Sequence, residues 1–472
     1  MAEGGINAAL NTKDENDSPE EHFTDTIKAA CGLADPNAVW GMTQAAPELV
    51  HWLLKLGVKF NMSGHDDVDL RNFGGQKKKR TAFAQSDTGK QIMTAMIDAV
   101  RRKEASGMVE RFSHHSFLTL RLCGNICCGC VIRDEYSQET VELPGDAVIV
   151  ATGGMHGLFG NTTGSLSNTG EVTAELFRLG VPLANGEMIQ YHPTTVKCGG
   201  KRMLISEAAR GEGGRLFAMK DGKQWYFMEE KYPELGNLMP RDITAREIWK
   251  VSHESEVFLD MTEISEEIIS NKLSGLADDC MTYLHKDIRK EPVSVLPGIH
   301  YFMGGILVDE QHRTPIQNLC AAGECCAQYH GANRLGGNSL LGALYGGRVA
   351  AKSACEQADV VDLSCATQID FPPASQISEI KQLNKVMQET MGVVRNENTL
   401  LNGIQTVQAL TGNLPLLGMA VLKSALARKE SRGAHWREDY PKSNDDDYLK
   451  TTVARFDGKQ IQISFVPVPE RR

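Results

Sequence analysis

The sequence predicts an α/β fold in which a discontinuous main domain is interrupted by an inserted α+β domain and followed by a helical domain. Two observations predict this fold. Apolar strands that close on glycine occur in two distant places, DAVIVATGG at 146–154 and GGILVDEQHRTPIQNLCAAGE at 304–324. Between them, from 189 to 303, short strands alternate with helices, as expected of an insertion. A chain of 472 residues is also too long for one ordinary core.

The expected boundaries follow these changes of pattern. The main domain takes residues 1–188 and 304–360, the insertion 189–303, the helical domain 376–435 and the C-terminal segment 436–472. A polar, proline-containing stretch at 366–378 is predicted as a linker, and 339–357 as a helix.

Residues 22–60 are predicted to form helices. Asp35-Pro36 offers an N-cap followed by proline at the first helical position, and Pro47 starts a second helix that ends at Gly57. Short strands separated by glycine and charged turns then follow over 116–150.

Composition and charge exclude several classes of protein. A formal net charge of −10 offers no overall attraction to nucleic acid or anionic lipid, so an anionic substrate must be attracted locally. No apolar run is long enough to span a membrane, and the best candidate, 414–427, is interrupted by Pro415 and Lys423. The N-terminus has no basic start followed by an apolar stretch, so we expect a cytoplasmic protein.

The chain has 12 cysteines, which we expect to be free thiols because no export signal precedes them. Cys123, Cys127, Cys128 and Cys130 cluster, which could suggest an iron–sulfur or zinc site. Their spacing fits neither usual pattern. Apolar alternation on both sides of Gly124-Asn125 favours a β-hairpin with buried thiols, so we predict no metal site.

Basic and polar side chains beside glycine-rich turns form the candidate site. His192, His300 and Arg334 supply the donors that a small dianion requires, and a guanidinium suits bidentate capture of a carboxylate. Ser206 adds a hydroxyl donor. Each residue alone also has a structural interpretation: a single histidine is more often hydrogen-bonded structure, and the Arg-Asp pair at 241–242 resembles a surface ion pair.

Eleven motifs in order along nearly the whole chain resemble the succinate dehydrogenase and fumarate reductase flavoproteins. They are AEGG at 2–5, RNFGG at 71–75, RTAFAQSDTG at 80–89, ATGG at 151–154, QYHPT at 190–194, SEAARGEGG at 206–214, PRD at 240–242, HYFMGG at 300–305, AAGE at 321–324, HGANRLGGNSLL at 330–341 and RKESRGAHWREDYP at 428–441. One such string would carry little weight, but eleven in order are hard to obtain by chance.

The resemblance implies a Rossmann-like FAD-binding domain with the insertion as a capping domain. It also implies that both carboxylates of succinate or fumarate are bound by His192, Ser206, His300 and Arg334. Ser206 stands where the family usually has threonine, and the hydroxyl is kept.

Three further residues match the family's proton-transfer positions. Arg241 matches its proton donor and acceptor, and Glu207 and Arg210 match its relay. Because the pKa of arginine exceeds about 12, Arg241 can act as an acid only if a relay replaces its proton.

The resemblance also assigns residues to FAD. The matching positions are Glu324 at the ribose, the Ser339-Leu340 backbone at the flavin ring, Gly4 and Gly5 in the turn beside the isoalloxazine, and Glu171, where the family more often has aspartate. A helix that begins near Ser339 would direct its N-terminal dipole at the flavin and favour negative charge on the reduced ring.

One expected motif does not occur. A Rossmann-type FAD site needs G-x-G-x-x-G after its first strand, and this sequence contains no such string. The family places that βαβ unit directly before AEGG. We therefore expect an N-terminally truncated chain, with Met1 as an internal start.

The expected function is FAD-dependent interconversion of succinate and fumarate by a flavoprotein subunit. Its expected partners are an iron–sulfur subunit and, through it, a membrane anchor, which would hold the chain at the inner face of the membrane. SRGAHWREDYP at 431–441 favours this branch. The alternatives are an L-aspartate oxidase, which usually carries NRLASNSLL where this chain has NRLGGNSLL, and a non-catalytic remnant without flavin.

Overall fold

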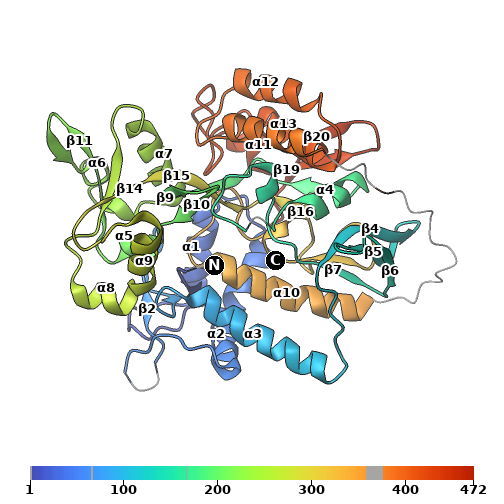
Figure 1. Ribbon diagram of the computed structural model, residues 1–472, viewed down its shortest axis with the longest axis horizontal. Coiled ribbons are helices and arrows are strands. Elements are labelled where there is room, and N and C mark those ends of the chain that lie inside the picture. Colours follow the sequence, from blue (N-terminus) through green and yellow to red (C-terminus); the bar gives the residue numbers. More distant parts are fainter. Residues whose placement is uncertain (1–2, 65–66, 166, 358–370, 372–375) are drawn as a thin grey trace.

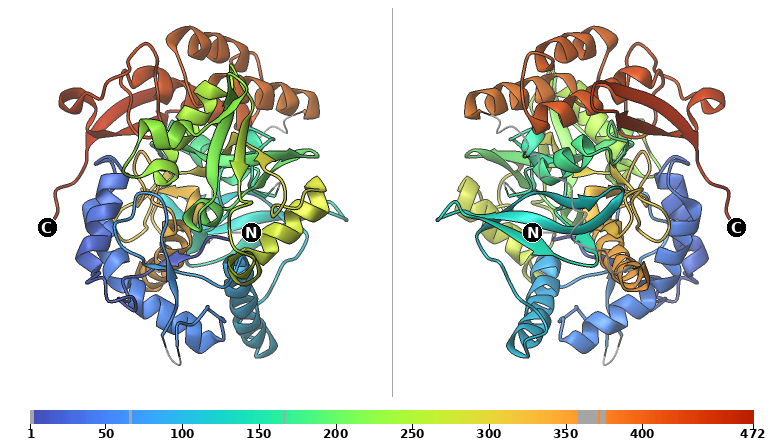
Figure 2. Two further views of the ribbon diagram at one scale, coloured as in Figure 1. Left: turned by 90° about the vertical axis from the view of Figure 1, so that its left-hand side faces the viewer. Right: turned by 90° about the vertical axis from the view of Figure 1, so that its right-hand side faces the viewer.

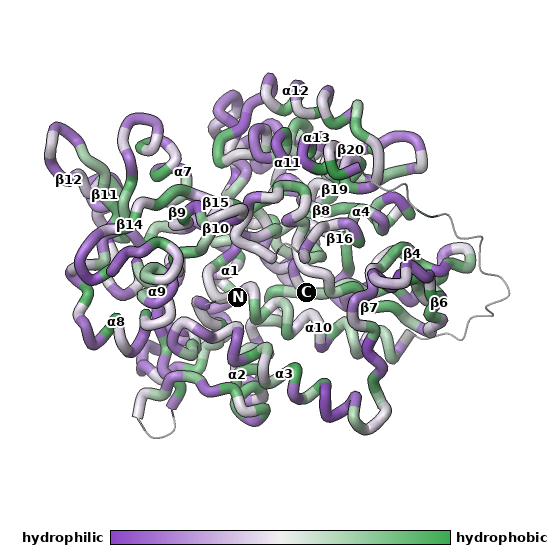
Figure 3. Tube along the Cα trace, viewed as in Figure 1, coloured by the Kyte–Doolittle hydropathy of each residue, from purple (hydrophilic) through white to green (hydrophobic). Residues whose placement is uncertain are grey.

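The computed structural model describes residues 3–64, 67–165, 167–357, 371 and 376–472. Three groups of elements surround helix α10 (Asn338–Gln357), which crosses the centre of Figure 1. The insertion lies to the left, the C-terminal helices lie at the top, and a small antiparallel sheet lies to the right. In Figure 3, hydrophobic residues fill most of α13 (Asn413–Ala427). The tip of the hairpin between β11 (Arg215–Lys220) and β12 (Lys223–Trp225) is hydrophilic (Figure 3).

The N-terminal part contains a short sheet and three helices. Strand β1 (Ile6–Asn7) pairs with β3 (Thr81–Ala82), which pairs with β2 (Leu70–Arg71). The helices of this part are α1 (Pro19–Ala29), α2 (Pro36–Leu56) and α3 (Thr88–Ala105).

Helix α2 begins and ends as predicted, but the expected break at Pro47 is wrong. The Asp35 carboxylate caps the helix by accepting from the N–H groups of Asn37 and Ala38, and Gly57 ends it with φ +100°. Pro47 lies inside one continuous helix. Buried positions 39, 42, 46, 49, 50 and 53 keep helical spacing across the proline, so burial of one continuous apolar face outweighs the hydrogen bond that proline removes.

The main domain is discontinuous, as the sequence predicts. Strand β7 (Val148–Val150) pairs in parallel with β17 (Leu319–Ala321), which lies beyond the insertion. Beside it, β4 (His115–Cys123), β5 (Ile126–Asp134) and β6 (Thr140–Pro144) form an antiparallel sheet. The β4–β5 hairpin turns at Gly124-Asn125 and buries the free thiols of Cys127 and Cys128, as predicted. Cys123 is disulfide-bonded, so the expectation of free thiols is wrong at this residue.

The insertion contains two sheets and several short helices. One sheet has the order β10-β9-β15 and consists of β9 (Ile189–Cys198), β10 (Lys201–Leu204) and β15 (Leu296–Phe302). The other has the order β12-β11-β13-β14 and consists of β11 (Arg215–Lys220), β12 (Lys223–Trp225), β13 (Val257–Asp260) and β14 (Val293–Ser294). The helices are α5 (Glu207–Gly211), α6 (Phe227–Lys231), α7 (Arg241–Val251), α8 (Glu266–Lys272) and α9 (Ser274–Asp279).

The C-terminal part packs three helices against the main domain and then returns to a sheet. The helices are α11 (Ile377–Thr390), α12 (Glu397–Val407) and α13 (Asn413–Ala427). After the short helix α14 (Asp445–Tyr448), strands β19 (Lys450–Phe456) and β20 (Ile461–Pro467) follow. The chain ends beside the start of α2 (Figure 2), where Arg472 N donates to Asn37 Oδ1 at 2.9 Å. The predicted linker at 366–378 lies largely outside the described residues.

A five-stranded sheet joins the C-terminal segment to both parts of the main domain. Its order is β18-β16-β8-β19-β20, with β8 (Leu183–Ala184), β16 (Gly305–Leu307) and β18 (Cys326–Ala327). Helix α4 (Glu171–Arg178) packs near it. The buried Arg428 guanidinium reinforces the join, because it contacts the carboxylates of Glu187 and Glu430 at 2.7 Å each. The domain boundaries stay predictions.

Candidate active site

The two candidate histidines come from paired strands of the insertion. Strands β9 and β15 pair antiparallel, and the register shifts between Ile299 and Tyr301 leave His300 as the extra residue of a β-bulge. The His300 and His192 rings lie with their centroids 5.1 Å apart at 68°. A bulge changes the direction of one side chain, which is how residues on two strands reach the same point.

Arg241 and Glu207 meet at the starts of two helices. Arg241 is the first residue of α7, and Glu207 is the first residue of α5. Arg241 Nε and Nη2 donate to Glu207 Oε2 at 2.8 and 2.5 Å, while Nη1 donates to Gln190 Oε1 at 3.0 Å. Arg210 Nη2 lies 3.5 Å from Glu207 Oε1. The structure therefore brings the three predicted proton-transfer residues into one buried cluster.

Two glycines enclose the Glu207 carboxylate. The backbone N–H of Gly74 donates to Oε1 at 3.1 Å. A Cβ added at Gly74 would lie 2.7 Å from Oε1, and one added at Gly336 would lie 2.9 Å from Oε2. Any side chain at either position would displace the carboxylate that Arg241 contacts.

The electrostatics of the cluster favour an ionised Glu207 and neutral histidines. Burial opposes ionisation of Glu207, but Arg241 and Arg210 overcome it and hold the pKa of the carboxyl below 4.5. Burial, with Arg241 next in importance, lowers the pKa values of His192 and His300 well below 6.5. Both imidazoles are therefore neutral at pH 7 and can donate one N–H each.

Arg334 is buried, and no ion pair joins it to an acid in the part of the chain that the structure describes. Its guanidinium lies 4.3 Å over the Tyr301 ring, and its Nε has no hydrogen-bond partner within the described residues. Burial, followed by repulsion from Arg241, lowers the pKa of Arg334 to about 9. Three buried arginines and one buried glutamate leave an excess of positive charge that a dianion would compensate.

Ser206 lies beside the same strand as His192. It caps α5, with its hydroxyl oxygen accepting from Ala208 N at 3.4 Å. The preceding residue, Ile205, donates its N–H to Thr194 O at 3.0 Å, which ties this segment to β9. The four residues predicted to bind carboxylates thus come from β9, β15, the start of α5 and the loop before α10.

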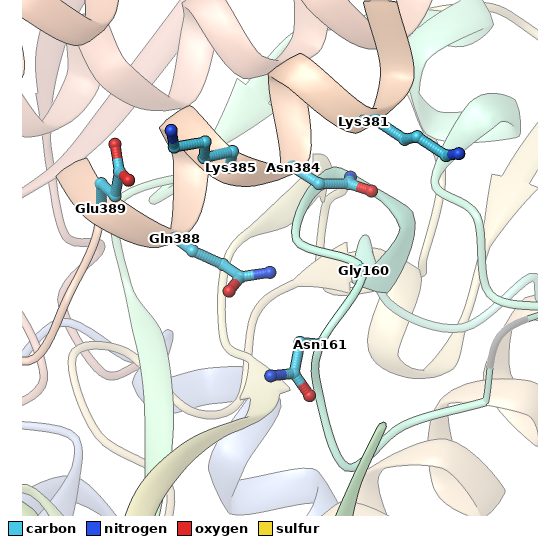
Figure 4. A pocket seen from close by; sticks show the side chains of 7 residues that line it. All are labelled: Gly160, Asn161, Lys381, Asn384, Lys385, Gln388 and Glu389. Atoms are coloured by element: carbon cyan, nitrogen blue, oxygen red, sulfur yellow. The ribbon is translucent and has the colours of Figure 1, made fainter. Parts of the chain in front are cut away.

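A surface pocket lies away from these residues. A pocket of about 370 Å³ opens between the loop at 160–161 and α11 (Figure 4). Its lining residues are Gly160, Asn161, Lys381, Asn384, Lys385, Gln388 and Glu389, none of which belongs to the predicted site. The candidate site is therefore defined by the chemistry of its buried groups and not by this pocket.

Comparison with known proteins establishes the family. A family model described as FAD binding domain matches residues 1–340, and one described as Fumarate reductase flavoprotein C-term matches residues 410–471. The succinate dehydrogenase flavoprotein subunit of Bacillus subtilis is 37% identical, over 100% of this chain and 91% of that protein. The chain belongs to the succinate dehydrogenase and fumarate reductase flavoprotein family.

Other relatives share this family's fold and extend its range of activities. A chain of E. coli quinol fumarate reductase matches with a TM-score of 0.89 and 27% identity, over 99% of this chain and 89% of that chain. An L-aspartate oxidase from a Nostoc species is 31% identical, over 96% of this chain and 86% of that protein. The enzyme is thus a flavoprotein oxidoreductase, and its cofactor is FAD.

The cofactor-side residues fit a ribose and a flavin ring. Glu324 Oε1 accepts from Phe302 N at 3.0 Å, while Oε2 makes no hydrogen bond to another described residue and can receive a ribose hydroxyl. A Cβ on Gly154 would lie 2.6 Å from Glu324 Oε1, so this glycine leaves room for the acid. Ser339 and Leu340 lie half-buried in the first turn of α10, where helix N–H groups have no partner within the helix.

The remaining predicted cofactor residues divide into two groups. Gly4 and Gly5 lead into β1, whose Asn7 N–H donates to Gly337 O at 3.1 Å beside the start of α10. Gly5 has φ +135° and lies too close to Ala82 for a side chain. Glu171, by contrast, lies exposed at the start of α4, and no contact in the described part of the chain joins it to Glu324.

The sequence analysis did not select two residues that contact the cluster. Gln190 accepts from Arg241, and Gly74 donates to Glu207. Gln190 lies two residues before His192, and side chains two apart lie on one face of a strand, so that spacing was the available signal. In the described residues, no helix is long and apolar enough to cross a membrane, and no cluster of three or more His, Cys, Asp or Glu could hold a metal ion.

Proposed function

We propose that the chain catalyses the interconversion of succinate and fumarate. The observation that carries this proposal is the buried cluster of Arg241, Glu207 and Arg210 beside two neutral histidines and the unpaired guanidinium of Arg334. A small dicarboxylate supplies the two negative charges that this site lacks.

The substrate is held at both ends. Arg334 and His300 bind one carboxylate, and His192 and Ser206 bind the other. Because the histidines are neutral, each donates a single N–H, and the guanidinium contributes the charge. Their donors polarise the carboxylate as negative charge develops on it in the transition state.

Proton transfer belongs to Arg241. A guanidinium has five N–H groups, of which three are donated to Glu207 and Gln190, so that one N–H remains on each terminal nitrogen for the substrate. FAD, when bound, exchanges a hydride with one substrate carbon. Arg241 gives a proton to the neighbouring carbon, or takes one from it.

The relay restores the charge of Arg241. Glu207 contacts Arg241 through one oxygen and faces Arg210 with the other, so a proton can pass along the three side chains. Arg210 also donates to Asn237 O at 2.6 Å, which holds it in place. Glu171, Glu324, Gly4, Gly5, Ser339 and Leu340 are proposed as FAD contacts, with Glu171 supported only by its place in the motif.

An iron–sulfur subunit is the proposed electron-transfer partner, with the chain peripheral on the inner face of the cell membrane. The names of the relatives support this, because several are subunits of succinate dehydrogenases or fumarate reductases. Residues 431–441, which resemble that branch, support it as well.

The test compares two substrates on the purified, FAD-loaded protein. Anaerobically reduced protein should be reoxidised by fumarate with formation of succinate. L-Aspartate with oxygen should give no iminoaspartate and therefore no ammonia or oxaloacetate. Steady ammonia release from L-aspartate would move the assignment to L-aspartate oxidase, and a protein that cannot be loaded with flavin would indicate the non-catalytic alternative.

A further inference from the structure

Two consecutive threonines hold two histidines that lie on different sides of the site. Thr162 Oγ1 lies 2.9 Å from His156 Nδ1, and Thr163 Oγ1 lies 2.8 Å from His300 Nδ1. His300 belongs to the proposed substrate site. The second ring nitrogen of His156 lies 3.5 Å from Glu324 Oε1, at the proposed cofactor site.

The hydrogen bonds of Thr162 favour one of the two positions for the ring proton of His156. Gly164 N donates to Thr162 Oγ1 at 3.2 Å, so the threonine oxygen acts there as an acceptor. An oxygen that already accepts one hydrogen bond is well placed to donate its own hydroxyl hydrogen, and His156 Nδ1 is the acceptor within reach. An imidazole that accepts at Nδ1 carries its proton on Nε2, the nitrogen that lies 3.5 Å from Glu324 Oε1.

The contact with Thr163 has the corresponding role at His300. The ring is neutral because burial and the nearby arginines lower its pKa well below 6.5, so only one nitrogen has a proton. If Thr163 donates to Nδ1, the proton lies on Nε2 and can be given to a carboxylate. The opposite tautomer would present a lone pair to the anion, which would weaken binding.

The loop that carries the threonines is held from three directions. Arg202 N donates to Thr162 O at 3.1 Å, and Thr163 N donates to Ile299 O at 3.0 Å, which joins the loop to the capping sheet. Two side chains of α11 also hold the loop: Asn384 Nδ2 donates to Gly157 O, and Gln388 Nε2 donates to Phe159 O. Figure 4 shows Asn384 and Gln388 on the α11 side of this loop.

A glycine makes room for the His156 ring. A Cβ added at Gly164 would lie 2.3 Å from His156 Cε1. On its other side, the ring packs edge-on against Phe302, with centroids 5.0 Å apart. His156 is therefore fixed in orientation, with Nε2 beside Glu324 Oε1.

We propose that Thr162 and Thr163 are positioning residues that fix the tautomers of His156 and His300, so that His156 aligns Glu324 for the FAD ribose and His300 donates to the substrate carboxylate. The substrate half of this inference rests on the proposed function. The cofactor half needs only FAD binding. Because the two threonines are adjacent, one loop sets the geometry of both ligands.

The test uses the FAD-loaded protein with two substitutions at position 163 and one control substitution at position 24. Thr163→Val removes the hydroxyl at nearly constant volume, Thr163→Ser keeps it, and Thr24→Val makes the same change on the exposed face of α1. Thr163→Val should raise the KM for fumarate about tenfold or more while kcat stays within about threefold, since one hydrogen bond to a neutral group is lost. Thr163→Ser should restore KM, and Thr24→Val should leave it unchanged.

Histidine ¹⁵N shifts give a readout that does not need turnover. His300, assigned from His300→Asn, should show a protonated Nε2 and an accepting Nδ1 in the wild type, and Thr163→Val should move the Nδ1 signal. Thr162→Val should do the same for His156 and weaken FAD binding, measured by flavin fluorescence, about tenfold. Unchanged shifts and unchanged KM in Thr163→Val would overturn the inference. A wild type with the expected shifts but without fumarate turnover would overturn only the proposed function.

Discussion

Replacement of Arg241 by glutamine separates proton transfer from substrate binding. Arg241 keeps two terminal N–H groups for the substrate, and glutamine has neither the charge nor a transferable proton. Substrate binding depends mainly on Arg334, the histidines and Ser206, so the Kd for fumarate should stay within about tenfold. Turnover should fall much further, because only the transition state uses the proton.

The expected size of the loss follows from the role of the group. A positioned acid or base contributes about 10²–10⁴-fold to a rate, which corresponds to about 2.7–5.5 kcal/mol of activation free energy. The substitution should also lower the stability of the fold, because Glu207 then keeps Arg210, 3.5 Å away, as its cationic partner. This loss of stability should appear as a lower melting temperature.

The assay is stopped-flow reoxidation of anaerobically reduced protein by fumarate, with Kd taken from the fumarate-induced change of the flavin spectrum. The control is Arg246→Gln on the same helix, whose guanidinium lies 4.0 Å over the Trp436 ring. The control should keep the wild-type rate. A rate within about tenfold of the wild type in Arg241→Gln, with FAD bound, would refute the role of Arg241.

Two further substitutions test the substrate clamp and the buried histidines. Arg334→Ala should weaken fumarate binding at least about hundredfold, because an unpaired buried carboxylate costs several kcal/mol. The control Arg313→Ala, which removes a more exposed ion pair, should leave the affinity unchanged. Equal fumarate affinities of Arg334→Ala and the wild type would contradict the clamp. His22 has its pKa lowered to about 3 by burial and Arg80, so the stability it contributes is complete above pH 6.5 and decreases as the pH falls toward 3. Between pH 7.5 and 5, the free energy of unfolding of the wild type should decrease by about 2 kcal/mol more than that of His22→Gln. If the melting temperatures of both proteins changed equally with pH, His22 would not be a neutral buried group.

The sequence predicted the order of elements well where a local signal was present. The Asp35 cap and Gly57 fixed the ends of α2, but Pro47 suggested a break that the continuous apolar face of the helix prevents. The pairing of β7 with β17 depends on contacts between segments about 170 residues apart. In the sequence, the only sign of this pairing was that an apolar strand ending in glycine occurs twice.

The candidate site shows a similar division. The motifs identified the residues that carry charge, and the structure brings Arg241, Glu207 and Arg210 together. Alternation along β15 could not reveal the bulge at His300, because a bulge inserts a residue without changing composition. Neutral partners were missed for a related reason. Gln190 contacts Arg241 and Thr163 contacts His300 across large separations in the sequence, and the sequence offered at most the strand spacing between Gln190 and His192 as a signal.

The most direct test is a crystal structure of the FAD-loaded protein with fumarate or succinate. The account predicts one carboxylate on Arg334 and His300, the other on His192 and Ser206, and a terminal nitrogen of Arg241 facing one of the two central carbons. Glu207 should keep its contact with Arg241 in that complex. A dicarboxylate bound outside this set of residues, or an Arg241 side chain turned away from the central carbons, would contradict it.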